Sequence, residues 1–396
     1  MLNQKQLKIA LFSDYFTDEE CIGGGVGTVV TNLASKISKK GYIVYVHTVS
    51  VNGEQIKYGK RLIIFKYSSI LRVCGTYLSL NLLIKPLKHD VDIVHIEGGI
   101  IASLAGLLYS ILKRKPLIVT IHQMEKAYRT FKNPLKRLLI SLYDKTFFEI
   151  MLSKADKIIV LSKCFLFSNR LFKFRDKIVV IPNGIDIDTT VLPVSKDEAL
   201  KRLKMSTNNK IVLFIGTLCR RKGVHLLIEA SKRVIKNFPN SIFIFVGGES
   251  DEIKISKIIK NLNDLRTHVY FTGYVSDFTK KLYYKIADLF VLPSLAEAFP
   301  LVLLEAAANG LPIIVSDIPV FKTLIKDGLN GLIVRNNDIN DLAEKILILL
   351  KDSDLRESLG RNAKKMVTNF SWDNVAEKHI QLYINVIKKH ASFIQE

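Results

Sequence analysis

The sequence predicts an α/β protein with two successive domains, each built on a parallel sheet between helices. Three observations predict this fold class. The chain has 396 residues, more than one hydrophobic core usually fills. Short β-rich runs alternate with helical periodicities in two separate stretches, which is typical of strand-helix units. Several of these runs are apolar at every position, as expected where helices cover both faces of a sheet.

Each domain has six predicted strands. The first sheet takes residues 8–12, 43–48, 93–96, 117–121, 157–161 and 178–181, and the second takes 211–215, 242–246, 269–271, 289–292, 313–315 and 331–334. Turn residues at 182–184 end the first series, so we predict domains at 1–185 and 186–370. An amphipathic helix over 371–390 follows, and we expect the segment 371–396 to pack back on the first domain.

Composition and charge narrow the function without naming it. Apolar residues make up 48% and charged residues 24%, which is globular composition. The net charge of +21 is concentrated in residues 1–185, which hold 28 Lys and Arg against 13 Asp and Glu. Such a field attracts anionic lipid, nucleic acid or phosphorylated substrates alike. The choice among these partners must come from motifs.

Cysteine usage and hydropathy indicate a cytoplasmic protein. The four cysteines lie far apart without a C-x-x-C pair, and no signal peptide precedes them, so we expect reduced thiols. The longest uncharged apolar run, residues 98–112, is shorter than the roughly 20 residues that a membrane-spanning helix needs.

One glycine turn follows the first strand of each predicted domain. The first includes Gly24, Gly25 and Gly27 and opens a helix, where backbone N–H groups can meet a phosphate. A tight turn without a ligand explains it equally well, because the full dinucleotide fingerprint is absent. The second runs from Gly216 to residue 223 and carries three cations.

The cations of the second turn favour phosphate binding. A solvated charge run is the simpler explanation, but the carboxyl end of a strand in a doubly wound sheet is where ligands bind. We assign Lys222 as a point charge and Arg221 as a possible fork on the phosphates.

Two carboxylates, Glu297 and Glu305, form the strongest motif. A helix is expected to start near Pro300, which places Glu305 about two turns inside it among leucine and alanine side chains. A carboxylate there is costly without a partner, so ligand binding is favoured over a purely structural role.

In their order along the chain, these motifs resemble family 4 of the retaining glycosyltransferases. The resemblance covers about residues 8–385 and rests on 24–27, His122 after an apolar strand, 181–186, 216–223 and the two glutamates. It implies a GT-B fold, with two facing Rossmann-like domains, a nucleotide diphosphate-sugar in the cleft between them and a terminal helix crossing back to the N-domain.

The resemblance also implies roles for single residues. Lys222 matches the lysine that neutralises the donor diphosphate, and Gly25 the glycine that faces it. Glu305 matches the residue that binds ribose and Glu297 the one that touches the transferred sugar, while His122 reaches sugar hydroxyls. The expected catalytic residues are therefore His122, Glu297 and Lys222, and the expected donor-binding residues are Gly24, Gly25, Gly216, Arg221, Lys222, Val275, Glu297, Phe299, Leu301 and Glu305. We assign His95 a structural role.

One departure affects the phosphate site. Where the family usually has arginine after the glycine of the phosphate loop, this chain has Thr217. Arg221 or Arg220 is a candidate substitute.

The implied reaction is retaining transfer of a hexose from a UDP- or GDP-sugar, without metal or cofactor, to a lipid-linked or glycan acceptor in cell-envelope polysaccharide or glycolipid synthesis. Residues 126–145 alternate cations with apolar groups, an interfacial pattern that suggests peripheral docking on anionic lipid. Its cations include Arg129, Lys132, Lys136 and Arg137. An ordinary amphipathic helix with a solvated face would show the same pattern.

Two other classes of protein remain possible. A non-catalytic partner subunit could keep the fold, although such a chain would be expected to lose some of the motif residues. A nucleic-acid-binding protein would explain the charge, but the sequence holds no recognised binding module. We therefore expect no nucleic-acid partner.

Overall fold

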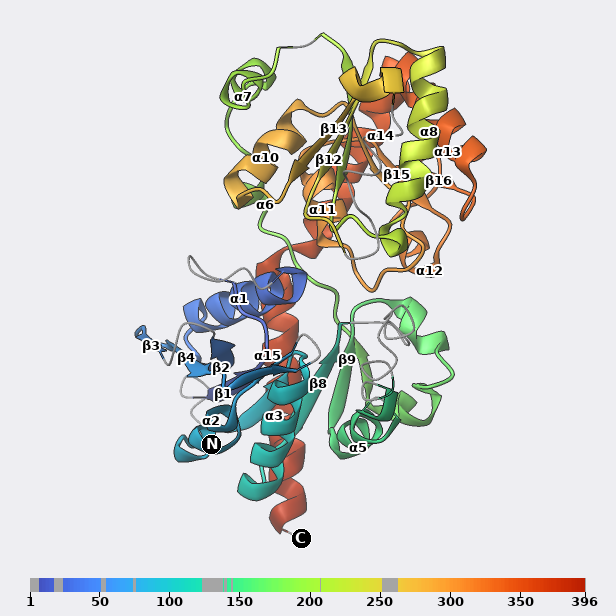
Figure 1. Cartoon of the computed structure of the whole chain (residues 1–396). Coiled ribbons are helices and arrows are strands. Elements are labelled where there is room, and N and C mark those ends of the chain that lie inside the picture. The colour runs from blue at the N-terminus through green and yellow to red at the C-terminus, as the bar shows by residue number, and fades with distance from the viewer. Residues whose placement is uncertain are drawn as a thin grey trace. The chain divides into compact units, whose positions relative to one another are not determined.

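The computed structural model describes residues 7–17, 24–50, 55–73, 76–122, 138, 141–143, 145–206, 208–250 and 263–395 (Figure 1). It confirms the predicted fold class, α/β with two parallel sheets. The chain divides into unit 1, Met1–Gly184 with Trp372–Glu396, and unit 2, Ile185–Ser371. Each unit is described by itself.

The sheet of unit 1 has the strand order β10-β9-β8-β7-β1-β2-β4-β3. All neighbours pair in parallel except β3 and β4. The strands are β1 (Lys8–Phe12), β2 (Ile43–Ser50), β3 (Gln55–Tyr58), β4 (Leu62–Ser68), β7 (Ile93–Ile96), β8 (Leu117–Ile121), β9 (Lys157–Val160) and β10 (Ile178–Val180). A separate hairpin pairs β5 (Leu71–Val73) with β6 (Thr76–Leu78). The sequence prediction missed β3 to β6.

Helices of unit 1 cover this sheet. They are α1 (Gly24–Lys39), α2 (Leu80–Ile84), α3 (Ile100–Lys113), α5 (Phe147–Lys154) and α15 (Trp372–Gln395), with 3-10 turns η2 (Lys85–Lys88), η4 (Lys163–Phe167) and η5 (Phe172–Lys177). Apolar residues at helical spacing explain α1, where Val30, Leu33 and Ile37 are fully buried. The terminal helix α15, red in Figure 1, packs against α1 and buries Ile380 and Tyr383 in unit 1.

The sheet of unit 2 is entirely parallel, with the order β13-β12-β11-β14-β15-β16. Its strands are β11 (Lys210–Ile215), β12 (Ser241–Val246), β13 (Val269–Gly273), β14 (Leu289–Leu292), β15 (Ile313–Ser316) and β16 (Leu332–Val334). Figure 1 shows α8 and α13 on one side of this sheet and α10 on the other. Its helices are α6 (Ile187–Thr190), α7 (Lys196–Arg202), α8 (Val224–Asn237), α10 (Asp277–Ile286), α11 (Leu301–Ala308), α12 (Pro319–Lys322), α13 (Ile339–Lys351) and α14 (Ser353–Val367), with turns η6 (Arg220–Lys222), η7 (Asn263–Thr267) and η8 (Thr368–Phe370).

Both sheets reverse their strand order at one point, between β1 and β7 in unit 1 and between β11 and β14 in unit 2. Loops that leave the carboxyl ends of strands on either side of such a reversal diverge, and ligands bind in the crevice that results. The glycine turns at 24–27 and 216–223 and the Glu297 segment all follow these strands. The topology therefore places the sequence motifs where a doubly wound fold binds its ligands.

Candidate functional site

The turn after β11 holds Lys222 against the segment after β14. Gly223 ends η6 at a φ of 70°, and a Cβ atom there would lie 1.9 Å from the Pro293 carbonyl oxygen. Only glycine allows that approach. The Leu295 N–H also donates to the Arg221 carbonyl at 2.8 Å, which joins the two loops by backbone.

Lys222 and Glu297 form a nearly buried ion pair. Lys222 Nζ lies 2.6 Å from Glu297 Oε1, and their side chains are 14% and 6% exposed. Ser294, which is fully buried, donates its hydroxyl to the same oxygen at 2.8 Å. The carboxylate and the ammonium thus satisfy each other in a place where leaving either charge unpaired would be costly.

Arg221 lies beside the same carboxylate. Its Nη1 donates to the Ala296 carbonyl at 3.0 Å and lies 3.6 Å from Glu297 Oε2. The side chain is half exposed, and its guanidinium carries more N–H donors than these two contacts use. Thr217 in the same turn is exposed. The structure therefore brings Arg221, Lys222 and Glu297 together at the carboxyl ends of β11 and β14.

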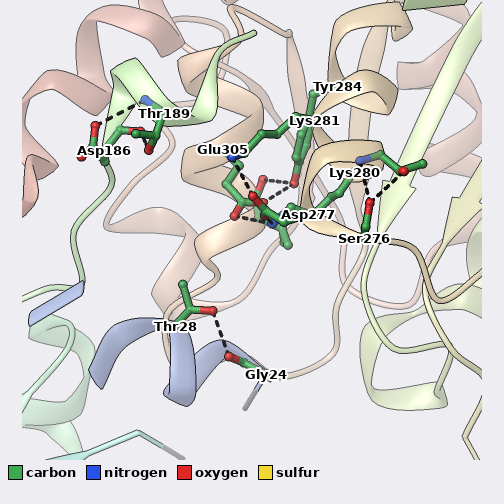
Figure 2. A network of polar contacts seen from close by, with 12 residues as sticks. Gly24, Thr28, Asp186, Thr189, Ser276, Asp277, Lys280, Lys281, Tyr284 and Glu305 are labelled. Atoms are coloured by element: carbon green, nitrogen blue, oxygen red, sulfur yellow. Dashed lines mark hydrogen bonds and ion pairs between the residues drawn. The ribbon is translucent and has the colours of Figure 1, made fainter. Parts of the chain in front are cut away.

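Glu305 lies in the second turn of α11 and has two partners on α10 (Figure 2). Lys280 Nζ lies 2.8 Å from Oε1, and the Tyr284 hydroxyl donates to Oε2 at 2.9 Å. Lys280 also pairs with Asp277 at 3.0 Å. Because these partners come from the protein, the burial of Glu305 does not by itself require a ligand.

The two donors to Glu305 keep their protons at neutral pH. Burial opposes the charge of Lys280, but the carboxylates of Glu305 and Asp277 outweigh it and raise the lysine pKa. Burial and the charge of Glu305 raise the pKa of Tyr284 well above its usual value. Glu305 is thus a fixed acceptor with lone pairs left for further hydroxyl groups.

The other predicted donor-binding residues of unit 2 are Phe299, Leu301, Val275 and Gly216. Phe299 is buried against Phe370, with ring centroids 6.0 Å apart. Leu301 opens α11 after Pro300, and no side chain caps this helix start. Val275 is half-buried in the turn before α10, and Gly216 directly follows β11. The uncapped N–H groups at the start of α11 suit an anionic or hydroxyl ligand.

In unit 1, the glycines at the start of α1 differ in what the fold requires. Gly24 has a φ of 63°, and a Cβ atom on Gly27 would lie 2.6 Å from Thr17 Oγ1. The Thr28 hydroxyl donates to the Gly24 carbonyl at 3.0 Å (Figure 2). A Cβ atom on Gly25 would meet nothing within 4 Å, and its φ is not positive. The described fold therefore explains Gly24 and Gly27 but not Gly25.

His122 follows β8 and pairs with a carboxylate. Its Nε2 lies 2.6 Å from Glu97 Oε2, and the two side chains are 7% and 1% exposed. Glu97 follows β7, the strand beside β8. His95 lies within β7, fully buried, and hydrogen-bonds Thr120 and Tyr383, both at 2.7 Å.

Four predicted membrane-contact residues, Arg129, Lys132, Lys136 and Arg137, lie outside the described residues. Within the part of the chain that is described, no helix combines the length and apolar content needed to cross a bilayer. No cluster of three His, Cys, Asp or Glu suited to a metal ion occurs in that part either.

Sequence reasoning missed several partners of the predicted residues. Lys280 and Tyr284, with Asp277, lie at helical spacing on one face of α10, a signal that was available. Ser294 and Glu97 each directly follow or nearly follow an apolar strand, as His122 does. A search for polar residues at every strand end would have found them.

Comparison with known proteins agrees with this geometry. The family model for Glycosyltransferase Family 4 matches residues 23–189, and that for Glycosyl transferases group 1 matches residues 195–366. The fold and these matches define a glycosyltransferase. The chain belongs to glycosyltransferase family 4, and its two units form the GT-B type of fold.

Two relatives and one solved structure span most of the chain. It is 29% identical over 81% of its length to the UDP-Gal:alpha-D-GlcNAc-diphosphoundecaprenol alpha-1,3-galactosyltransferase of Escherichia coli, of which 81% is covered. It is 24% identical over 97% of its length to the alpha-monoglucosyldiacylglycerol synthase of Acholeplasma laidlawii, of which 98% is covered. Anabaena HepE in complex with UDP and glucose is similar in structure, with a TM-score of 0.74, 18% identity and coverage of 96% of this chain and all of HepE.

Proposed function

We propose that this glycosyltransferase retains the anomeric configuration while it moves a hexose from a UDP- or GDP-sugar to a lipid-linked or glycan acceptor. The observation that carries the proposal is the Lys222–Glu297 pair at 2.6 Å, with Arg221 beside it, at the switch point of unit 2. Cations at that edge suit a diphosphate, and carboxylates nearby suit hydroxyl groups.

Lys222 is the proposed counter-charge of the donor diphosphate. When the bond between sugar and diphosphate breaks, negative charge grows on the leaving phosphate, and a cation already in place stabilises it without reorganisation. Arg221 would add a planar donor pair and so replace the arginine absent at Thr217. The uncapped start of α11, near Phe299 and Leu301, adds N–H groups of the same polarity.

The carboxylates are proposed to orient the donor. Glu305, held by Lys280 and Tyr284, would accept hydrogen bonds from the ribose hydroxyls. Glu297 would contact the transferred sugar, and His122 of unit 1 a hydroxyl of that sugar. Gly24, Gly25, Gly216 and Val275 would contribute backbone close to the nucleotide. We propose no cofactor and assign the charge stabilisation to these cations.

We propose uridine as the nucleoside of the donor, with guanosine as the next candidate. The name of one relative carries UDP-Gal, and one protein of similar fold was solved in complex with UDP and glucose. Thermal unfolding against a panel of UDP- and GDP-sugars tests this choice, because a ligand that binds the native state raises apparent stability. Stabilisation by neither series would contradict the proposal.

The acceptor is proposed to be lipid-linked, reached from the cytoplasmic face of a membrane. The E. coli relative acts on a diphosphoundecaprenol-linked sugar, and the A. laidlawii relative is named for a glucosyldiacylglycerol. The positive charge of residues 1–185 supports contact with anionic lipid. Neutralising Lys132, Lys136 and Arg137 should reduce sedimentation with anionic vesicles, and unchanged sedimentation would remove these residues from the proposal.

Retention and the acceptor are tested together by product analysis. With the active donor, the anomeric proton coupling of the product should match that of the donor. An inverted product would overturn the retaining assignment.

The Arg221→Glu variant should bind the donor more weakly, since it places a negative charge beside the diphosphate.

A further inference from the structure

Glu97 is a buried carboxylate that the proposed reaction does not yet use. It follows β7 in unit 1 and is 1% exposed. Burying a carboxylate requires hydrogen-bond donors or a counter-charge. The donor that the structure provides is His122, whose Nε2 lies 2.6 Å from Oε2.

The other carboxylate oxygen of Glu97, Oε1, has no hydrogen-bond partner among the described residues. Oε1 lies 3.2 Å from His95 Nε2, but no donor among the described residues is aligned well enough to hydrogen-bond it. The bond from His122 is therefore the strongest that Glu97 makes in the described structure.

The charge state of Glu97 fixes the direction of this bond. Burial alone would raise the carboxyl pKa, but His95 and His122 together hold it down at about 2. Glu97 is thus ionised at neutral pH and can only accept. His122 must donate from Nε2, and in a neutral ring the proton then leaves Nδ1 with a free lone pair.

The rest of the network supports the same arrangement. Burial lowers the pKa of His95 to about 4, so this ring is neutral. Tyr383 on α15 lies 2.7 Å from His95 Nδ1, and burial raises the phenol pKa well above its usual value. The phenol therefore keeps its proton and donates a hydrogen bond to Nδ1. The proton of the neutral His95 ring then lies on Nε2, the nitrogen that faces Glu97 and Thr120.

None of the described residues hydrogen-bonds Nδ1 of His122. We propose that Glu97 is the positioning residue of His122: it fixes the ring orientation and the Nε2–H tautomer, so that Nδ1 accepts a hydrogen bond from a hydroxyl of the transferred sugar. The sugar hydroxyl rests on the proposed function, whereas the tautomer does not. A carboxylate that only tied β7 to β8 would contribute stability, and its loss would leave the kcat of a folded protein unchanged.

The tautomer is measured directly in the full-length protein. Long-range proton-nitrogen correlation spectra of protein labelled with ¹⁵N-histidine identify which ring nitrogen carries the proton, and a His122→Gln variant assigns the signal. We expect the neutral ring of His122 to be protonated at Nε2. A proton on Nδ1 of the neutral ring overturns the proposal, whatever reaction the protein performs.

Variants then separate positioning from structure. Glu97→Gln keeps the shape but loses the obligate acceptor, so His122 should populate the Nδ1–H form. The value of kcat should fall by about 10–100-fold, by analogy with the hydrogen-bond partners of metal-bound histidines, with little change in KM for the donor. A folded Glu97→Gln protein with the wild-type tautomer and kcat overturns the proposal.

Thr120→Val is the matched control, because it removes a polar contact of His95 without touching the Glu97–His122 bond. This variant should keep the Nε2–H tautomer of His122. If Thr120→Val lost that tautomer as well, the effect would come from a general disturbance of the network, and the specific role of Glu97 would be overturned. If Glu97→Gln does not fold, the wild-type spectrum still shows whether the neutral ring of His122 carries its proton on Nε2, and a proton on Nδ1 overturns the proposal. If no nucleotide sugar supports transfer by the wild type, the proposed function fails while the tautomer measurement stands.

Discussion

Lys222 and Glu297 compensate each other in the unliganded protein. Their 2.6 Å contact means that a diphosphate does not meet a bare lysine but one already hydrogen-bonded to a carboxylate. Such a pair holds the ammonium in place, since removing either partner would leave the other charge largely buried and unpaired. The half-exposed Arg221 then has the freer donors for an arriving phosphate.

Gly25 offers a test in which stability and function separate. Its Cβ position is open and its φ is not positive, so Gly25→Ala should leave unit 1 as stable as before or up to about 1 kcal/mol more stable, because alanine favours the helix. If backbone at Gly25 approaches the donor, the added methyl group should reduce kcat/KM at least about tenfold, or roughly 1.4 kcal/mol. Thermal unfolding and initial rates measure the two effects.

Gly27→Ala is the control with the opposite expectation. Its Cβ atom would lie 2.6 Å from Thr17 Oγ1 and 3.2 Å from the Phe16 carbonyl carbon, so this variant should lose stability. Full transfer activity in Gly25→Ala would withdraw Gly25 from the donor site.

At the scale of single residues, the sequence indicated motif members but not their partners. Lys222, Glu297 and Arg221 could be chosen because they follow strands of the predicted sheet. The Lys222–Glu297 contact spans 75 positions in the chain and depends on how closely two loops approach at Gly223, which no local pattern encodes. His95 was assigned a structural role, and its hydrogen bond to Tyr383 joins residues 288 positions apart.

At the scale of elements, buried parallel strands were the easiest to predict because they are apolar at nearly every position: β14 is wholly apolar, and β8 is apolar except at Thr120. The strands β3 and β4 were missed although residues 62–68 are β-rich. They lie at the sheet edge, and the turn between them carries Lys60 and Arg61, which interrupts the apolar pattern. Helix α15 begins one residue after its predicted start and continues to Gln395, five residues beyond its predicted end.

The attachment of α15 to unit 1 should depend on apolar burial rather than on its ion pairs. Lys36–Asp373 and Lys40–Glu377 join α1 to α15 but involve largely exposed carboxylates. Replacing both lysines with methionine should cost at most about 1 kcal/mol. Ile380→Ala, at a side chain that is 1% exposed, should cost about 2–5 kcal/mol.

The single tryptophan, Trp372, begins α15, so its fluorescence during urea unfolding reports this attachment. An equal loss of stability from the lysine pair and from Ile380→Ala would contradict the account of how α15 is held.

At the scale of the whole molecule, unit 1 should begin to lose stability in acid at pH values well above those at which carboxylates usually titrate. Burial lowers the pKa of His47 to about 3 and that of His95 to about 4, so between these values and about 6.5 the unfolded chain binds more protons. Their contribution is complete above pH 6.5 and is lost as the pH falls, toward about 4 for His95 and toward about 3 for His47. Glu97, with its pKa lowered to about 2, adds a loss of the same sign below about 4.5.

Asp14 opposes this trend in part. Burial raises its pKa to about 6, so its folded form gains protons that the unfolded chain lacks, and stability from this group is lost as the pH rises through 6. Because Asp14 opposes His47 and His95, and burial lowers the pKa of His379 as well, unfolding free energies measured between pH 7.5 and 4.5 should still fall with pH. His47→Gln should flatten the slope, and an unchanged slope would contradict the assignment.

The central claim is that the Lys222 loop holds the diphosphate of the donor. The direct measurement is the binding of UDP and GDP to the wild type and to the Lys222→Met/Glu297→Gln variant, in which both charges of the pair are removed together, so that neither is left buried alone. We predict that one of the two nucleotides stabilises the wild type by about 2.7 kcal/mol at 100 times its Kd and that the double variant loses this gain while keeping its unliganded stability. Equal nucleotide affinity of the two proteins would contradict the account.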